Sequence, residues 1–298
     1  MSLPGSFVPT PAGRVFVHRG GKSGGAPLVL IHGWMMTHWC FRPVLEVLGA
    51  ERELFAIDLP GFGESDRPQP SAFAYDAGAF ADVVDEVMRA LGLGRADIVG
   101  HSMGGGVAIT LAARHPERVQ RLVAVAAVVY PITDLPLLAK VGLLPVIGRH
   151  LARVGLTRRE FARSCRERSV RDGRVLDDEW IDYFWARLNR AGGHEAAHRC
   201  FTVMTSAAEN NADPGRVRAP TLLVWGDEDR LIPMTHGKRL VRAIAGARLD
   251  VVPASGHMPF IERPDEFLRV VRPFLAAPAA PLTETPIPPR RAHSVTAS

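Results

Sequence analysis

The sequence has few cysteines, little net charge and no glycine-rich phosphate loop, and each shortage argues against a class of protein. Its 298 residues include only three cysteines, Cys40, Cys165 and Cys200. An odd number at wide spacing indicates neither a disulfide framework nor a zinc pattern. His194 and His198 lie four residues apart without the third ligand that a metal site needs. The 36 basic and 31 acidic residues leave a net charge of +5, and no basic cluster is interleaved with aromatic residues. We therefore expect no nucleic acid partner, metal or cofactor.

Long apolar runs are also absent. The most apolar stretch, residues 135–147, is interrupted by Lys140, Gly142 and two prolines and is well short of the roughly 20 apolar residues of a transmembrane helix. It predicts a buried helix, with a mobile lid that touches lipid as the alternative. The first 25 residues contain no apolar core of signal-peptide length. We therefore expect a cytoplasmic protein without stable membrane anchoring.

Apolar segments of strand length alternate with helical patterns along most of the chain. Hydrophobic residues make up 47% of the sequence, which is enough for one large core at this length. Alternation of this kind is typical of a mostly parallel sheet with helices on both faces, so the sequence predicts an α/β fold. The expected strands are 28–31, 54–57, 97–99, 122–129, 221–225 and 249–252, with part of a first strand around Val15 and Val17.

Three helices of the core have clear sequence signals. Asp76 leads into 77–91, where apolar residues recur at helical spacing until Gly92. A second helix is expected at 105–114, and Pro264 with two acidic residues opens a third at 267–275. The composition after residue 276 turns to Ala, Pro, Thr and Ser, which predicts a disordered tail over 277–298.

The alternation is interrupted between residues 131 and 216, which is far longer than a strand crossover requires. An apolar stripe after Asp177 and a segment at 195–209 indicate helices in this insertion. We expect a helical cap at 131–216 and an α/β core made of 1–130 and 217–276. Eight arginines between 149 and 171 make part of the cap basic. Such a run is typical of a solvated helical face, and one arginine that turns inward to hold a substrate carboxylate is the alternative.

One motif carries more chemical information than the rest of the chain. Gly100-His101-Ser102-Met103-Gly104 fits the G-x-S-x-G pattern, which places a serine on a strained turn between a strand and a helix. Residues two before and two after the serine approach closely in such a turn, and glycine relieves that contact. The alternative is a glycine-rich loop that contains an incidental serine.

Catalytic partners for this serine follow downstream. Serine is a poor nucleophile at neutral pH and needs a histidine as base and a carboxylate that orients it. The acidic residues Asp227, Glu228 and Asp229 follow the expected strand 221–225, and His257 follows the strand 249–252. Because the carboxyl ends of parallel strands meet at one edge of a sheet, these groups are expected to share a site with Ser102.

Five motifs in this order resemble the α/β-hydrolase superfamily over residues 10 to 276. They occupy residues 28–34, 58–65, 100–104, 225–233 and 255–259. The chain looks most like the serine-nucleophile branch that contains bacterial esterases, haloperoxidase-like enzymes and meta-cleavage-product hydrolases. The resemblance implies an α/β-hydrolase fold in which a cap covers the serine and shapes the substrate pocket.

The resemblance also implies a role for each matching residue. Ser102 matches the nucleophile and His257 the base. The Trp-Gly-x-x-Asp pattern of the family places the acid at Asp229, with Asp227 as the alternative. The backbone N–H groups of Trp34 and Met103 match the two donors of the oxyanion hole, whereas His32 matches a structural histidine.

These residues predict a serine hydrolase that cleaves carboxylic esters of small to medium apolar substrates through an acyl-enzyme. The alternatives are a C–C bond hydrolase of the meta-cleavage-product type or a cofactor-free perhydrolase, and a non-enzymatic small-molecule receptor. Meta-cleavage-product hydrolases usually have a glycine-rich extension after His-Gly, and perhydrolases commonly have a proline there, whereas this chain continues with Trp34 and Met35. The walls of the substrate pocket are expected among the apolar residues of the cap, namely Trp180, Phe184, Trp185, Phe201 and Met204.

Overall fold

The centre of the computed structural model is an eight-stranded sheet. The structure describes residues 4–133, 143, 157–206 and 213–278. The strand order is β1-β2-β4-β3-β5-β6-β7-β8. The pairs β1/β2 and β2/β4 are antiparallel, and the other neighbours are parallel. The strands are β1 (Gly5–Thr10), β2 (Gly13–Gly21), β3 (Ala26–Ile31), β4 (Arg52–Ile57), β5 (Ala96–His101), β6 (Val119–Val125), β7 (Thr221–Gly226) and β8 (Arg248–Val252).

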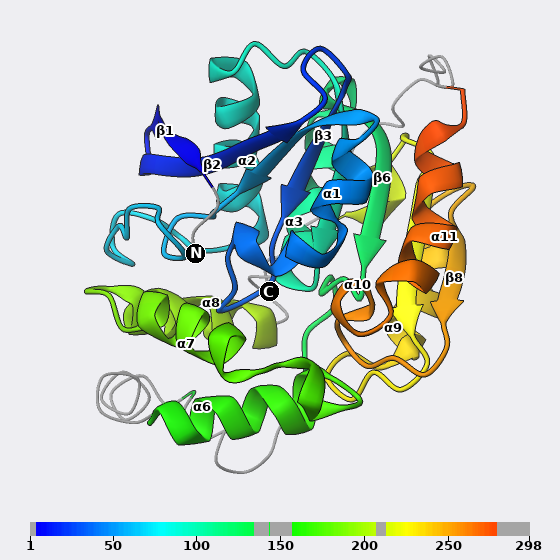
Figure 1. The fold of residues 1–298 in the computed structure, drawn as a ribbon. Coiled ribbons are helices and arrows are strands. Elements are labelled where there is room, and N and C mark those ends of the chain that lie inside the picture. The colour runs from blue at the N-terminus through cyan, green and yellow to red at the C-terminus, as the bar shows by residue number, and fades with distance from the viewer. Residues whose placement is uncertain (1–3, 134–142, 144–156, 207–212, 279–298) are drawn as a thin grey trace, which may run out of the picture.

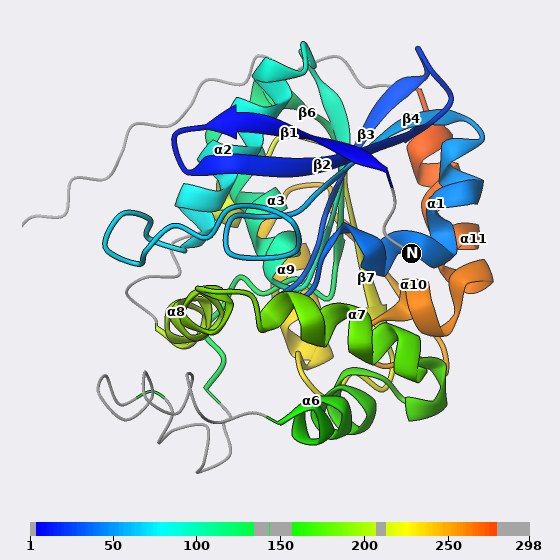
Figure 2. The same cartoon turned by 60° about the vertical axis from the view of Figure 1, so that its left-hand side comes forward.

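Helices cover both faces of this sheet, which confirms the predicted fold class. Figure 2 shows α1 and α11 on one side of the strands and α2 and α3 on the other. The helices of the core are α1 (Arg42–Gly49), α2 (Ala77–Ala90), α3 (Met103–Arg114), α9 (Met234–Ala243), α10 (Pro259–Glu262) and α11 (Pro264–Ala276). Short helical turns are η1 (His38–Phe41), η2 (Pro116–Arg118) and η5 (Pro214–Arg216).

The central strands are buried on both faces. Every residue of β5 and β7 is buried, as expected for parallel strands between two helical layers. Element bounds differ from the sequence prediction by a few residues at several places, and one strand was not predicted. β6 ends at Val125 rather than at residue 129, because Ala126 adopts a left-handed φ of 46° that an extended strand does not accommodate. α3 begins at Met103, two residues earlier than expected. The edge strand β1 was not predicted, since only Val8 of its six residues is buried.

The predicted insertion leaves the sheet after β6 and returns at β7. Its described elements are α6 (Arg158–Ser164), the π-helical turn η3 (Cys165–Ser169), η4 (Gly173–Val175), α7 (Asp178–Leu188) and α8 (Gly193–Thr205). Thr157 and Glu160 form a capping box at the start of α6, and the Asp177 side chain caps α7. These elements lie beyond the carboxyl ends of the parallel strands (Figure 1). We call residues 157–206 the cap.

Part of what the sequence predicts lies outside the described residues. This applies to the helix at 135–147 except for Leu143, to Arg149 and Arg153, and to nearly all of the tail after residue 276. Within the described ranges, no helix combines the length and the apolar character needed to cross a membrane.

Candidate active site

Ser102 lies on a sharp turn between β5 and α3. Its backbone has φ 55° and ψ −117°, a conformation that costs a non-glycine residue about 1–3 kcal/mol. Neighbouring glycines make the turn possible. A Cβ atom on Gly100 would lie 2.3 Å from the carbonyl oxygen of Gly104, and one on Gly104 would lie 2.3 Å from that of His32. The two glycines therefore explain how the chain can place Ser102 on a sharp turn at the end of the strand.

Two backbone amides near Ser102 have no hydrogen-bond acceptor among the described residues. Met103 is the first residue of α3, where helix geometry leaves the N–H group unpaired and the helix dipole favours negative charge. Trp34 follows β3, and no carbonyl accepts from its amide within the described chain. These are the amides that the sequence predicts for the oxyanion hole.

His257 and Asp229 form a buried hydrogen-bonded pair. The Nδ1 atom of His257 lies 2.8 Å from Oδ2 of Asp229, and their side chains are 4% and 1% exposed. The second carboxylate oxygen of Asp229 accepts the amides of Leu231 and Ile232 at 2.9 and 3.0 Å. Because both oxygens accept, the carboxylate is oriented and Nδ1 of His257 carries the proton. The remaining ring nitrogen, Nε2, is then the basic one.

The other two acidic residues of this loop point elsewhere. Asp227 is exposed, and its Oδ1 accepts the amide of Ser255 at 3.2 Å. Glu228 pairs with Arg171 of the cap at 2.5 Å. Of the three carboxylates, the described hydrogen bonds bring only that of Asp229 to His257.

Within the described residues, no hydrogen bond joins Ser102 to His257. Such bonds are often long without substrate and shorten in the substrate complex. The two residues are nevertheless connected through His101, whose Nε2–H donates to the carbonyl oxygen of His257 at 3.0 Å. Burial lowers the pKa of His101 well below the usual value, so His101 stays neutral beside His257.

Glu262 is a residue near the site that the sequence analysis missed. Its Oε1 accepts the amides of Gly256 and Met258 at 2.9 and 3.3 Å, on either side of His257. Its Oε2 accepts the amide of Arg171 from the cap at 2.6 Å. A glutamate five residues after the candidate base was the available signal, but nothing local distinguishes it from a helix-surface residue.

His32 has two structural hydrogen bonds. Its Nδ1–H donates to the carbonyl oxygen of Gly33 at 2.7 Å, and its Nε2 accepts the amide of Leu59 at 3.0 Å. Both ring nitrogens are therefore occupied, and burial lowers the pKa of this histidine. The ring connects the loop after β3 with the loop after β4.

The predicted pocket residues lie in four different surroundings. The ring of Phe201 stacks on Trp34 with centroids 5.6 Å apart. The rings of Trp180 and Phe184 lie 4.6 and 6.0 Å from Trp39 in η1. Trp185 contacts Phe161 and His194 within the cap. The carbonyl oxygen of the buried Met204 accepts the amide of Ile132, which lies outside the cap. Of these five residues, Phe201 is the one whose ring contacts Trp34, a residue of the candidate oxyanion hole.

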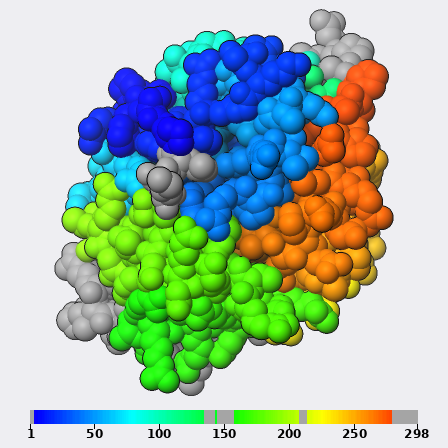
Figure 3. Space-filling model, in the orientation of Figure 1, coloured from blue at the N-terminus to red at the C-terminus, as the bar shows by residue number. Residues whose placement is uncertain are grey.

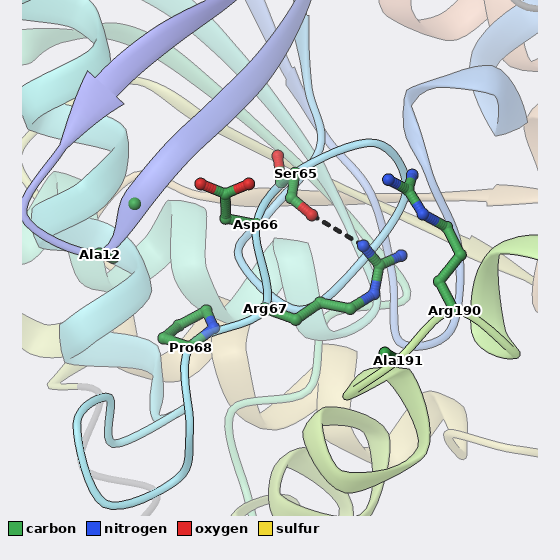
Figure 4. Close-up of a pocket in the computed structure, with 8 residues that line it drawn as sticks. Ala12, Ser65, Asp66, Arg67, Pro68, Arg190 and Ala191 are labelled. Carbon is green, nitrogen blue, oxygen red and sulfur yellow. Dashed lines mark hydrogen bonds between the residues drawn. The ribbon is translucent and has the colours of Figure 1, made fainter.

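Several cap arginines are already paired with carboxylates. Arg187 and Arg190 each lie 2.7 Å from Glu64 of the core. Arg190 also lines a surface cavity of about 660 Å³ with Arg67, Asp66 and other residues of the junction between core and cap. None of the candidate catalytic residues lines this cavity (Figure 4). In the described part of the chain, no group of three His, Cys, Asp or Glu residues is arranged to hold a metal ion.

Residues 26–264 match the family model described as alpha/beta hydrolase fold. The chain therefore belongs to the α/β-hydrolase family and is a hydrolase. It is 34% identical over 275 residues to the 2-hydroxymuconate semialdehyde hydrolase of Pseudomonas sp. (strain CF600), which covers 88% of this chain and 90% of that protein. It is 30% identical over 258 residues to the pimeloyl-[acyl-carrier protein] methyl ester esterase of Neisseria meningitidis, with 83% and 75% covered.

Solved structures agree with this assignment. The meta-cleavage product hydrolase CumD from Pseudomonas fluorescens IP01 superimposes with a TM-score of 0.74 at 27% identity, covering 91% of this chain and 97% of that one. A thermophilic esterase from Thermogutta terrifontis shares the fold, with a TM-score of 0.75 at 23% identity over 91% and 98% of the two chains.

Proposed function

We propose that this hydrolase cleaves carboxylic esters of small to medium apolar substrates through an acyl-enzyme on Ser102. The observation that carries the proposal is the hydrogen-bonded pair of His257 and Asp229, which belongs to the same sheet edge as the strained Ser102 turn. Strain of this kind persists only where the surrounding structure holds it, and it is common at catalytic residues.

Each step of the proposed ester hydrolysis uses a residue of the candidate active site. Nε2 of His257 takes the proton of the Ser102 hydroxyl as the oxygen attacks the ester carbonyl. Asp229 stabilises the imidazolium that forms, because its carboxylate stays oriented by two backbone amides. The amides of Trp34 and Met103 bind the oxyanion. His257 then protonates the leaving alcohol, and a water activated by the same histidine releases the acid.

The charges of the cap favour an apolar ester. Six of the described cap arginines, Arg158, Arg166, Arg171, Arg174, Arg187 and Arg190, each have a carboxylate partner that a substrate carboxylate would have to replace. Arg159, Arg163 and Arg168 are exposed on the cap surface. Phe201, beside Trp34, offers an apolar wall instead. We propose that the core consists of residues 1–130 and 217–276 and that the insertion that contains the cap spans residues 131–216.

A second candidate is hydrolysis of a C–C bond next to a ketone. It is favoured by the relatives named as 2-hydroxymuconate semialdehyde hydrolase and 2-hydroxy-6-oxo-2,4-heptadienoate hydrolase, at 34% and 31% identity. The same nucleophile, base and oxyanion donors would serve this reaction. The two candidates differ in whether the substrate carries a carboxylate.

A parallel substrate screen tests the proposal. It compares p-nitrophenyl esters of graded acyl length with a vinylogous diketone acid, and the Ser102→Ala variant serves as the blank. Each methylene buried against the cap stabilises the bound acyl group by about 0.8 kcal/mol, so kcat/KM is expected to rise roughly fourfold per methylene until the pocket is filled. Fast cleavage of the diketone with negligible turnover of every ester would overturn the esterase proposal in favour of the second candidate.

A further inference from the structure

The Trp34 side chain fastens the loop after β3 to the cap. Its indole Nε1–H donates to the carbonyl oxygen of Ala197 in α8 at 2.8 Å. The same ring stacks on Phe201, one turn further along α8, with ring planes 24° apart. Both partners belong to one helix, so α8 fixes the position and the tilt of the indole together.

The backbone beside Trp34 is strained. Met35 has a left-handed φ of 56°, which a non-glycine residue keeps only where its surroundings enforce it. A few residues further along the same segment, Trp39 packs against Trp180 and Tyr183 of α7, with centroids 4.6 and 4.3 Å apart. The segment 34–39 is thus held by aromatic residues of two cap helices. Figure 3 shows the green surface of the cap directly against the blue surface of the core.

The loop of the candidate base also touches the cap. The amide of His257 donates to the carbonyl oxygen of Ser169 at 3.1 Å, and the Arg171 amide donates to Glu262, the residue that also binds the amides flanking His257. The cap therefore contacts both loops that bring groups to Ser102.

We propose that the Trp34 indole is a positioning group that couples the cap to the oxyanion hole. Helix α8 holds the indole, the indole holds the strained loop, and the loop sets where the Trp34 amide lies. The inference rests on the proposed function, in which this amide binds the oxyanion. Its consequence is that contacts between an acyl group and α8 change kcat as well as KM, because substrate contacts distant from the reacting carbonyl are used in the transition state.

The decisive variant is Trp34→Phe, which keeps the backbone amide and an aromatic ring but removes the indole N–H. With p-nitrophenyl acetate, whose acyl group is too short to report on the pocket walls, kcat is expected to fall roughly 10-fold to 100-fold with KM within about twofold. This loss is smaller than the roughly 10²–10³ for complete removal of one oxyanion donor. A trifluoromethyl ketone, which binds as an oxyanion, is expected to bind more weakly by the same factor, whereas the melting temperature stays close to that of the wild type.

A second pair of variants isolates the stacking contact. Phe201→Leu keeps the hydrogen bond to Ala197 and removes the ring. It is expected to weaken the binding of methyl trifluoromethyl ketone, whose methyl group is too short to report on the pocket walls, in the same direction even if Trp34→Phe does not fold. Phe7→Leu is the matched control, because this ring lies 46% exposed in the edge strand β1. It is expected to leave both kcat and inhibitor binding unchanged.

Amide hydrogen exchange gives a readout that needs no turnover. Trp34→Phe is expected to speed amide exchange in the two peptides that cover residues 33–41 and 193–205. Loss of the hydrogen bond from the indole to Ala197 makes local opening of both the loop and α8 easier. Unchanged exchange in either peptide, or a wild-type kcat and inhibitor affinity in Trp34→Phe, overturns the coupling. A failure of the proposed function would give a different result, namely equal ester turnover by the wild type and by Ser102→Ala.

Discussion

The exchange of Asp229 for asparagine tests the proposed triad most sharply, because the hydrogen bonds of Asp229 determine how the new side chain sits. One carboxylate oxygen accepts two backbone amides, from Leu231 and Ile232, and the other accepts Nδ1 of His257. In Asp229→Asn the amide oxygen must remain with the two N–H groups, since the opposite orientation would set donors against donors. The NH2 group then faces His257.

This orientation places the proton on the wrong nitrogen of His257. An NH2 donor opposite Nδ1 requires a lone pair there, so the ring proton moves to Nε2. Nε2 can then no longer accept the proton of Ser102. The same change in a well-studied triad lowers kcat by about 10⁴, which corresponds to about 5.4 kcal/mol of activation free energy. We expect a loss of this size.

Asp227→Asn is the matched control, because it makes the same chemical change two residues away. Asp227 is exposed, and its Oδ1 accepts the Ser255 amide, a bond that the amide oxygen of asparagine can keep. We expect kcat within about twofold of the wild type. The assay is steady-state hydrolysis of a p-nitrophenyl ester by both variants, with circular dichroism to verify folding. A larger loss in Asp227→Asn than in Asp229→Asn would refute the assignment and move the catalytic acid to Asp227.

Three further outcomes are expected. Ser102→Ala, His257→Ala and the double variant should each lose nearly all ester turnover, and losses that add up in the double variant would argue against a shared mechanism. Gly33→Ala should lower kcat by roughly 10-fold or more, because the new Cβ would lie 2.8 Å from Nδ1 of His101 and 3.1 Å from Cβ of Ser102. Gly94→Ala is the control and should leave kcat unchanged, because no atom lies within 4 Å of its new Cβ. The pKa of His101 is lower in the folded state than the value of 6.5 of an unfolded histidine. Unfolding below about pH 6.5 is therefore accompanied by uptake of a proton. The contribution of His101 to stability is therefore complete above that pH and is lost as the pH falls below it. Urea unfolding of the wild type should lose more stability than that of His101→Gln as the pH falls from about 7.5 to 5.5, and equal slopes would contradict the prediction.

The sequence predicts those parts of the fold and site that local chemistry determines. Continuous apolar runs identify the central strands because both faces of a parallel sheet are buried, and the pair Gly100 and Gly104 marks the turn at Ser102 because only glycine fits there. Long-range contacts carry no such signal. Glu262 and the Trp34 indole find their partners in the cap, far away along the chain. The end of β6 depends on one left-handed residue, Ala126, that composition does not reveal.

The place where the cap leaves the core has a thermodynamic consequence. β6 and β7 are adjacent strands that hydrogen-bond to each other, with Val125 opposite Val224, so the two ends of the insertion are brought together by the sheet itself. Closing a loop between fixed ends costs free energy that grows only with the logarithm of its length, about 0.6 kcal/mol for each doubling. The core can therefore carry insertions of very different length at this point with little change in its own stability. What limits exchange of one cap for another is the fit of its underside to the two loops beside Ser102, not the length of chain that must be accommodated.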